Sequence, residues 1–142
     1  MTLFRPVGLK ELELIAESGW RAFPPRLEWQ PFFYPVLNVE YAEQIARDWN
    51  TTDDNSGHSG FVTRFDVDDA FVSRYDVQIV GSAKVHKELW VPAEELDAFN
   101  THVLAPIEVV ASYYGERFSG ERDARSGLPT SLVSFPRSAE GR

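Results

Sequence analysis

The chain has 142 residues, of which 43% are hydrophobic and 25% are charged, a size and balance typical of one soluble globular domain. Its formal net charge of −8 argues against nucleic acid or an anionic membrane surface as a partner, and the absence of cysteine excludes disulfide bonds and thiolate chemistry. The first residues lack the apolar run of a signal peptide, and no stretch of about 18 apolar residues suits a membrane span. We therefore expect a cytoplasmic protein.

The beginning of the chain predicts a strand, a helix and an irregular segment. Residues 3–7 have the composition of a short strand that Pro6 ends or bends. The apolar residues of segment 9–18 recur at helical spacing, and Gly19 is well placed to end that helix. Residues 20–31 contain three prolines and two tryptophans, which excludes a regular helix or a central strand.

A second strand and a second helix are expected next. Residues 32–36 (FFYPV) form an aromatic strand that a proline interrupts, and Asn38 can cap a helix over residues 38–50. The expected apolar side of this helix consists of Tyr41, Ala42, Ile45 and Trp49. The polar loop at residues 50–60 contains acidic side chains and a histidine, but their spacing matches no calcium loop, so we expect no metal site.

Four more strands are expected, with a short helix before the last. Residues 61–67 alternate between two sets of side chains, and residues 75–80 form another strand that Gly81 turns toward the next one. Residues 106–114 (PIEVVASYY) predict a closing strand. Short strands with helices clustered early in the chain favour an α+β fold over a doubly wound one.

The sequence HKELWVPAEELDAFN, residues 86–100, predicts the third of these strands followed by the short helix. Alternation along the strand turns two apolar residues toward a core, Leu89 and Val91. Its other face carries Glu88 between His86 and Trp90. A carboxylate in the middle of a strand can line a cleft, whereas the plainer interpretation is a solvated residue on a half-exposed strand.

The last part of the chain changes character. We expect residues 1–118 to form a single domain and residues 119–142 to be a flexible tail, because the segment after Gly120 is polar and rich in turn-forming residues. Three apolar residues of this segment could still dock on the domain: Leu132, Val133 and Phe135.

Several kinds of catalytic site are missing from the sequence. No glycine-rich phosphate loop follows a strand, no G-x-S-x-G elbow is present, and the three histidines lack the spacing of metal ligands. What remains is Arg5 on the first strand, the aromatic second strand around Tyr34, and Glu88 on a late strand.

The order of these three features resembles the ADP-ribosyltransferase-like fold. In that superfamily an arginine or histidine on the first strand holds NAD, a serine or tyrosine on the second strand supports it, and a late glutamate is catalytic. Residues 1–118 also resemble a family of short bacterial proteins that carries the name ADP-ribosylation/crystallin J1. The segments that carry this second resemblance are FRPVGLKELELIAESG, FPPRLEWQPFFYPVLN, EYAEQIARDWN and KELWVPAEEL.

The resemblance implies a small split antiparallel sheet with a few helices, and NAD as cofactor. It makes Glu88 the catalytic residue, Arg5 a phosphate ligand, and Tyr34 a support for the bound NAD. Phe33, Tyr34 or Trp90 could stack on nicotinamide or adenine. His86 stands two residues before the glutamate, where many transferases place a residue that contacts the acceptor, and we include it in the candidate site.

Two functions follow from these observations. The first is NAD-dependent ADP-ribosyl transfer or NAD glycohydrolysis, or nucleotide binding by a relative without activity. The alternative is a non-catalytic interaction module that uses its aromatic loop and acidic surface, in which Arg5 is only an ion-pair partner or a surface residue. Arg5 and Glu88 facing one pocket would favour the first function, and the two pointing apart into solvent would favour the second.

Overall fold

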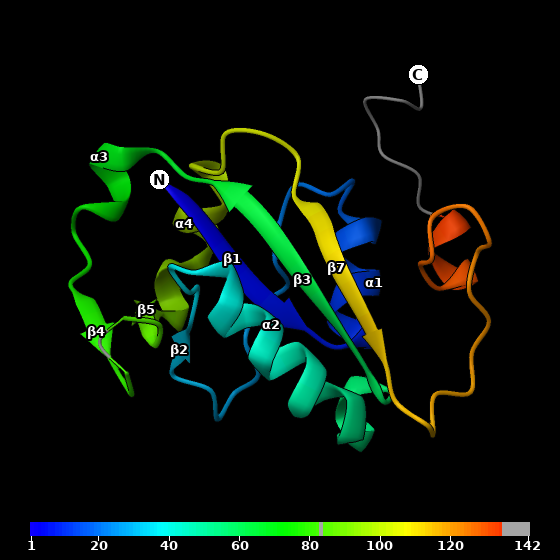
Figure 1. Ribbon diagram of the computed structural model, residues 1–142. Helices are drawn as coiled ribbons and strands as arrows, with labels where there is room; N and C mark the ends of the chain where they lie inside the picture. The colour runs from blue at the N-terminus through cyan, green and yellow to red at the C-terminus, as the bar shows by residue number, and fades with distance from the viewer. Residues whose placement is uncertain (83, 135–142) are drawn as a thin grey trace.

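The fold is built on a three-stranded antiparallel sheet, in which β1 (Thr2–Val7) pairs with β3 (Ser59–Asp66) and β3 pairs with β7 (Glu108–Tyr114) (Figure 1). The computed structural model describes residues 1–82 and 84–134, without the side chains of residues 133 and 134. These long strands run side by side through the middle of the molecule, so they form the frame on which the other elements pack.

The sheet continues beyond β1 through a single residue, Val36. Isolated bridges pair Val36 with Phe4 of β1 on one side and with Glu88 on the other. Glu88 belongs to β5 (Lys87–Leu89), which pairs with β4 (Val77–Ile79). A separate short pair joins β2 (Phe32–Phe33) to β6 (Val91–Pro92). The result is a mixed structure of helices and small antiparallel sheets, which confirms the expected combination of helices and antiparallel strands.

Pro6 lies on β1 just beyond the point where this strand pairs with Val36. The N–H and the C=O of Phe4 both bond to Val36, so the even-numbered residues of β1 turn their backbone groups away from β3. Val36 is followed by α2 rather than by more strand, so among the described residues no strand pairs with this edge of β1 at Pro6. Proline has no N–H to leave unpaired, and it is therefore tolerated at such a position.

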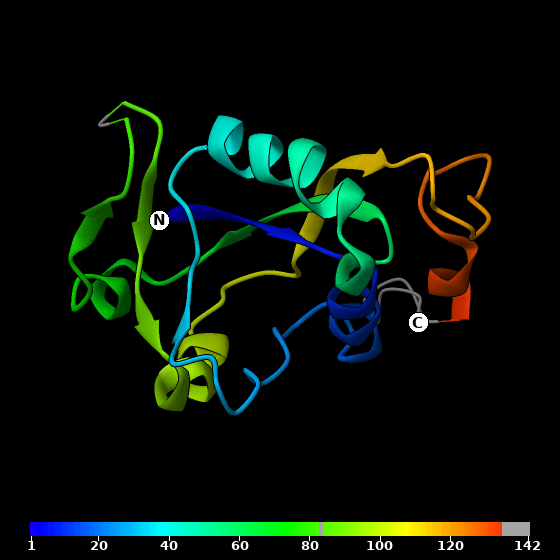
Figure 2. The ribbon, with the colours of Figure 1, turned by 90° about the horizontal axis from the view of Figure 1, so that it is seen from below.

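The described residues contain four α-helices and several short 3₁₀ turns on the two faces of the sheet. The α-helices are α1 (Leu9–Glu17), α2 (Val39–Asp48), α3 (Asp69–Val72) and α4 (Leu96–Thr101). The 3₁₀ turns are η1 (Asn50–Thr52), η2 (Asp54–Ser56), η3 (Ala93–Glu95) and η4 (Thr130–Ser134). Figure 2 shows α2 on one side of the strands and α1 and α4 on the other. None of the helices in the described ranges is both long and apolar enough to cross a bilayer.

The helix α1 follows its sequence pattern closely. Leu12, Ile15 and Ala16 are buried, and the helix ends where Gly19 takes a φ of 80°. The N–H of Gly19 bonds to the carbonyl of Ala16, which satisfies one of the free carbonyls at the helix end. Trp20 follows with a φ of 65° and packs into the core.

The helix α2 lies on the sheet with a different side from the one expected. Ala42 and Ala46 are buried against the sheet, whereas Trp49 is 58% exposed and Ile45 is only partly covered. The close approach of helix and strand explains the difference, because a Cβ added to Gly60 of β3 would lie 2.4 Å from the Ala46 carbonyl oxygen. Small residues therefore make the contact, and the larger side chains are left at the border of the sheet.

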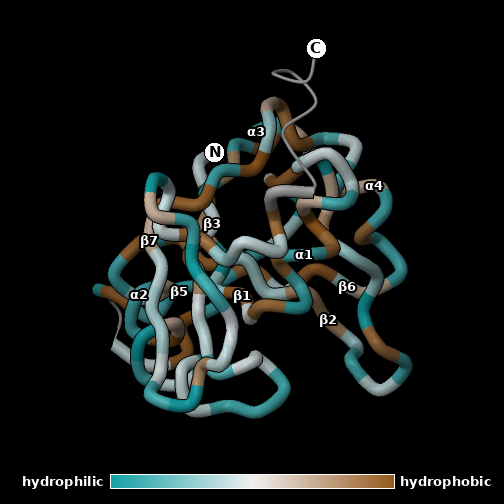
Figure 3. Tube along the Cα trace, turned by 90° about the vertical axis from the view of Figure 1, so that its right-hand side faces the viewer, coloured by the Kyte–Doolittle hydropathy of each residue, from teal (hydrophilic) through white to brown (hydrophobic). Residues whose placement is uncertain are grey.

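The main core lies on the face of the sheet that α1 and α4 cover, and aromatic rings fill much of it. Phe33 and Phe99 pack with their ring centroids 5.3 Å apart, and the ring of Phe23 lies 4.7 Å from that of Phe65. Figure 3 shows hydrophobic stretches in the strands and helices that surround this core. Leu89 and Val91 are buried as the alternation predicted.

The segment after β7 is packed against the domain as far as it is described. Leu132 is 6% exposed and belongs to the main core. The Tyr114 hydroxyl donates to the Gly127 carbonyl at 2.6 Å, and the guanidinium of Arg122 lies 4.6 Å from the Tyr114 ring. Leu132 therefore docks on the domain, as the sequence allowed, and the contacts of Tyr114 with Gly127 and Arg122 hold the segment before it. The predictions for the Val133 side chain and for Phe135 lie outside the described residues.

Candidate functional site

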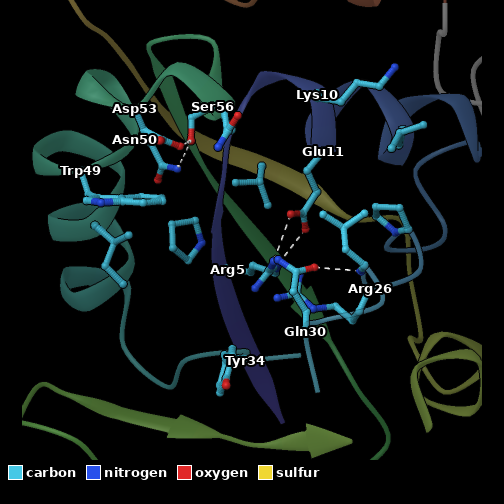
Figure 4. A pocket seen from close by; sticks show the side chains of 18 of the residues that line it. Arg5, Lys10, Glu11, Arg26, Gln30, Tyr34, Trp49, Asn50, Asp53 and Ser56 are labelled. Carbon is cyan, nitrogen blue, oxygen red and sulfur yellow. Dashed lines mark hydrogen bonds and ion pairs between the residues drawn. The ribbon is translucent and has the colours of Figure 1, made fainter. Parts of the chain in front are cut away.

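A cleft of about 560 Å³ runs along the open edge of β1. One wall comes from α1 and the loop at residues 24–30, and the other comes from the end of α2 with η1 and η2. Tyr34, Val36 and Glu88 also line it. Figure 4 shows Arg5 of β1 beside Glu11 of α1, on the side of the cleft that faces away from Trp49. The cleft is of the size that binds small molecules.

Glu88 is a buried carboxylate with both oxygens occupied. It is 9% exposed, its Oε1 accepts from the Tyr41 hydroxyl at 2.9 Å, and its Oε2 accepts from the Trp90 indole N–H at 2.8 Å. Burial, followed by the hydrogen bond to Glu88, raises the pKa of Tyr41 to about 12, so this phenol remains a donor at neutral pH. Both donors are neutral, and they orient the carboxylate without cancelling its charge.

The pairing of the strands decides which face of the sheet each residue occupies. Phe4, Val36 and Glu88 are directly opposite one another, so their side chains share the face that α2 covers. This register explains why Tyr41 of α2 can reach Glu88. Arg5 follows Phe4 and turns to the other face, so Arg5 and Glu88 reach the cleft from opposite faces at the open edge.

Arg5 is held in a buried ion pair. Its Nε donates to Glu11 Oε2 at 2.7 Å and its Nη2 donates to Glu11 Oε1 at 3.0 Å. The guanidinium lies 4.7 Å from the centroid of the Phe33 ring, and the residue is 8% exposed. Arg5 is therefore an ion-pair partner, as the plainer interpretation had it, and it also lines the cleft. One edge of its guanidinium is already used by Glu11.

Arg26 is a cationic residue of the cleft that the sequence did not reveal. Its Nε donates to the Phe32 carbonyl at 2.9 Å, and no ion pair with a carboxylate is found for it among the described residues. Burial, and then the charge of Arg5, hold the pKa of Arg26 below its usual value. With Lys10, this wall of the cleft carries three cations against the single carboxylate of Glu11. An anionic ligand would be attracted to it.

The expected aromatic residues are only partly brought to the cleft. Tyr34 lines it, and its ring forms a surface group with Phe32 and Trp90 at centroid distances of 6.1 and 6.4 Å. Trp90 is 40% exposed, and its indole N–H donates to Glu88, which lines the cleft. Phe33 is a correction to the expected set, because it is 1% exposed in the core and cannot stack on a ligand.

His86 is also a correction, because it is part of a loop contact outside the cleft lining. Its Nδ1 accepts from the Ser82 backbone N–H at 2.8 Å, and its Nε2 lies 3.1 Å from Gln44 Oε1. The ring packs edge-on against Tyr41 at 4.8 Å. His86 therefore supports the residue that holds Glu88, and both of its ring nitrogens have partners.

The polar loop forms hydrogen bonds among its own side chains. The Nε2 of His58 lies 2.7 Å from Asp54 Oδ1, and Ser56 Oγ donates to Asp53 at 2.7 Å. No cluster of three or more histidine, aspartate or glutamate side chains that could hold a metal ion is found in the described ranges.

Comparisons of this chain with protein-family models, with curated proteins and with solved structures found no match. A functional assignment therefore depends on the cleft itself: an oriented carboxylate, a tyrosine ring and a cationic wall around one cavity.

Proposed function

We propose that the cleft binds NAD or a closely related nucleotide, and that the protein is an ADP-ribosyltransferase-like enzyme for ADP-ribosyl transfer or NAD glycohydrolysis. One observation carries the proposal: the oriented carboxylate of Glu88 lines the same cleft as Tyr34 and two guanidinium groups. Arg5 on the first strand, Tyr34 directly after the second and Glu88 on a later strand follow the order that suggested this superfamily, whereas Arg26 comes from the loop before β2.

Glu88 is the catalytic residue in this proposal. When the bond between nicotinamide and ribose breaks, its electron pair leaves with nicotinamide and positive charge develops on the ribose. A carboxylate beside that ribose stabilises the charge by about a few kcal/mol in a site shielded from water. Water or an acceptor group then forms the new bond to the ribose carbon and releases a proton. Tyr41 and Trp90 are positioning residues, because they hold the two oxygens of Glu88.

Arg26 and Arg5 supply the binding of the diphosphate. Among the described residues, Arg26 donates through its Nε alone, so both of its Nη groups can donate to phosphate oxygens. In the same part of the chain, Glu11 occupies one edge of the Arg5 guanidinium, and the other edge can face a ligand. This changes the division of roles expected from the sequence: Arg26 makes the main phosphate contact, and Arg5 adds to it.

The test is a titration with NAD, followed by thermal unfolding and by the release of nicotinamide. Wild-type protein should be stabilised by NAD and should release nicotinamide. Glu88→Gln should keep the stabilisation and lose the release, because it keeps the shape of the side chain and removes its charge. Stabilisation without release in the wild type would indicate a nucleotide-binding relative without activity. A wild type that ignores NAD at millimolar concentration would overturn the proposal.

A non-catalytic interaction module remains the second candidate, and the exposed apolar side chains of the loop before β2 favour it. Trp29 is 76% exposed and Leu27 is 53% exposed. Large apolar side chains gathered on one loop are typical of contacts with another protein. If the protein is an interaction module, Trp29→Ala should lower its affinity for a protein partner. If it is an enzyme acting on NAD, Trp29→Ala should change neither the binding nor the cleavage of NAD.

A further inference from the structure

The end of the cleft opposite the cationic wall has no role in the chemistry above. It is formed by Trp49, which follows α2, and by Asn50, Asp53 and Ser56 of the η1–η2 turns. Trp49 directly follows the amphipathic helix α2 and lines the cleft. Its side chain is 58% exposed. Pro6 and Ile45 are further apolar residues of the cleft lining. A planar ligand would find an aromatic face here.

A hydrogen-bond chain determines how the amide of Asn50 is oriented. Asn50 Nδ2 donates to Ser56 Oγ at 2.8 Å, and Ser56 Oγ donates to Asp53 Oδ2 at 2.7 Å. Because a carboxylate only accepts, the hydroxyl hydrogen of Ser56 points to Asp53, and Ser56 must accept from Asn50. The amide nitrogen is thereby assigned, and Asn50 Oδ1 is the atom left over.

Asn50 Oδ1 is a buried acceptor without a donor among the described residues. The side chain is 4% exposed, and no hydrogen bond reaches this oxygen. Leaving a buried acceptor unpaired is destabilising, so such an atom in a cleft points to a donor from outside the chain. Figure 4 shows the amide of Asn50 beside the indole of Trp49 and below Ser56.

We propose that Trp49 and Asn50 form a binding site for the amino-bearing edge of a planar heterocycle, a 6-aminopurine. The ring lies against the indole of Trp49, and its exocyclic amine donates a hydrogen bond to Asn50 Oδ1. Since that oxygen is buried, the mostly exposed indole turns as the ring enters. The carboxylate of Asp53 strengthens the preference for a donor on the ligand. The choice of a purine rests on the proposed function, in which this ring is the adenine of NAD.

The test compares adenosine 5′-monophosphate with purine riboside 5′-monophosphate by calorimetric titration. The two differ only in the amino group, so the comparison needs no substitution of Asn50, whose loss would also remove its bond to Ser56. The aminopurine should bind about five- to tenfold more tightly, as expected for one hydrogen bond to a buried acceptor. Equal affinities, or no binding of either nucleotide at millimolar concentration, would overturn the inference.

Substitutions of two tryptophans supply the second half of the test. Trp49→Ala should weaken both nucleotides on the order of tenfold, and Trp49→Phe should restore most of the affinity, because a stacking face is regained. Trp29→Ala is the matched control: Trp29 is 76% exposed and lies outside the cleft lining, so affinity should not change. An unchanged affinity of Trp49→Ala would refute the proposed contact.

The failure of this inference can be told apart from the failure of the proposed function. A preference for the aminopurine that depends on Trp49, without release of nicotinamide from NAD, would support this site and refute catalysis by Glu88. Release of nicotinamide that requires Glu88, with equal affinity for the two nucleotides, would support the proposed function and refute this site.

Discussion

Replacing Tyr41 by phenylalanine tests whether Glu88 is held as the structure shows. The change removes only the hydroxyl that donates to Glu88 Oε1 at 2.9 Å, and it keeps the ring that packs on His86. A hydrogen bond to a charged group contributes about 1.5–3 kcal/mol to stability. Tyr41 is only partly buried, so we expect a loss near the lower end of this range, about 1.5–2 kcal/mol in the free energy of unfolding at pH 7.

The assay is urea unfolding of a double-mutant cycle with Glu88→Gln. In the glutamine background the lost hydrogen bond is between neutral groups, so Tyr41→Phe should cost about 1 kcal/mol less than in the wild type. The same variant should lower the rate of nicotinamide release while leaving NAD affinity unchanged, because Tyr41 orients Glu88 and does not line the cleft. Equal losses of stability in both backgrounds would show that the hydroxyl does not interact with the charge of Glu88.

Four further predictions concern pH, the two cleft arginines and the C-terminal segment. The pKa of Tyr41 is raised from its ordinary value of 10.0 to about 12, so the stability that this group contributes is complete below pH 10 and is lost as the pH rises toward 12. Between pH 9 and pH 11, the free energy of unfolding measured in urea should therefore fall less for Tyr41→Phe than for the wild type. Arg26→Ala should weaken NAD binding on the order of tenfold or more in a calorimetric titration, and it should lower the free energy of unfolding by about 0.5–1.5 kcal/mol because its hydrogen bond to the Phe32 carbonyl is lost. Arg5→Ala should lower the free energy of unfolding by about 2–3 kcal/mol in urea, because it breaks a buried ion pair. Leu132→Ala should cost about 2–3 kcal/mol in urea unfolding, whereas Leu104→Ala, at a leucine that is 63% exposed, should cost almost nothing.

Local pattern was sufficient for much of the fold. The alternation around Glu88 placed Leu89 and Val91 in the core and kept the carboxylate on the other face, because side-chain direction in a strand depends only on neighbouring residues. Gly19 ended α1 for an equally local reason, since glycine takes a positive φ without steric cost. These are properties of a few consecutive residues.

The rest depended on contacts between distant residues. The close approach of Gly60 to Ala46 decided which side of α2 packs against the sheet, and Trp49 was exposed as a consequence. The spacing of apolar residues along the helix does not reveal this contact with a distant strand. Arg26 reached the cleft because an irregular loop turns back toward β1, and the path of such a loop is set by tertiary packing. The position of Arg5 on the first strand could be predicted from the sequence, whereas the partner of its ion pair, Glu11, became visible only in the structure.

The position of Val36 bears on how the cleft can change its width. Val36 is a lining residue, and its segment also joins the two halves of the sheet through four backbone bonds, two to Phe4 and one each to Lys87 and Leu89. Widening the cleft at this point would require these bonds to part, whereas side chains elsewhere along it can turn in place. The backbone therefore fixes the distance between Glu88 and the cationic wall. A ligand that contacts both must match this distance, and the side chains at each end then select among the ligands that do.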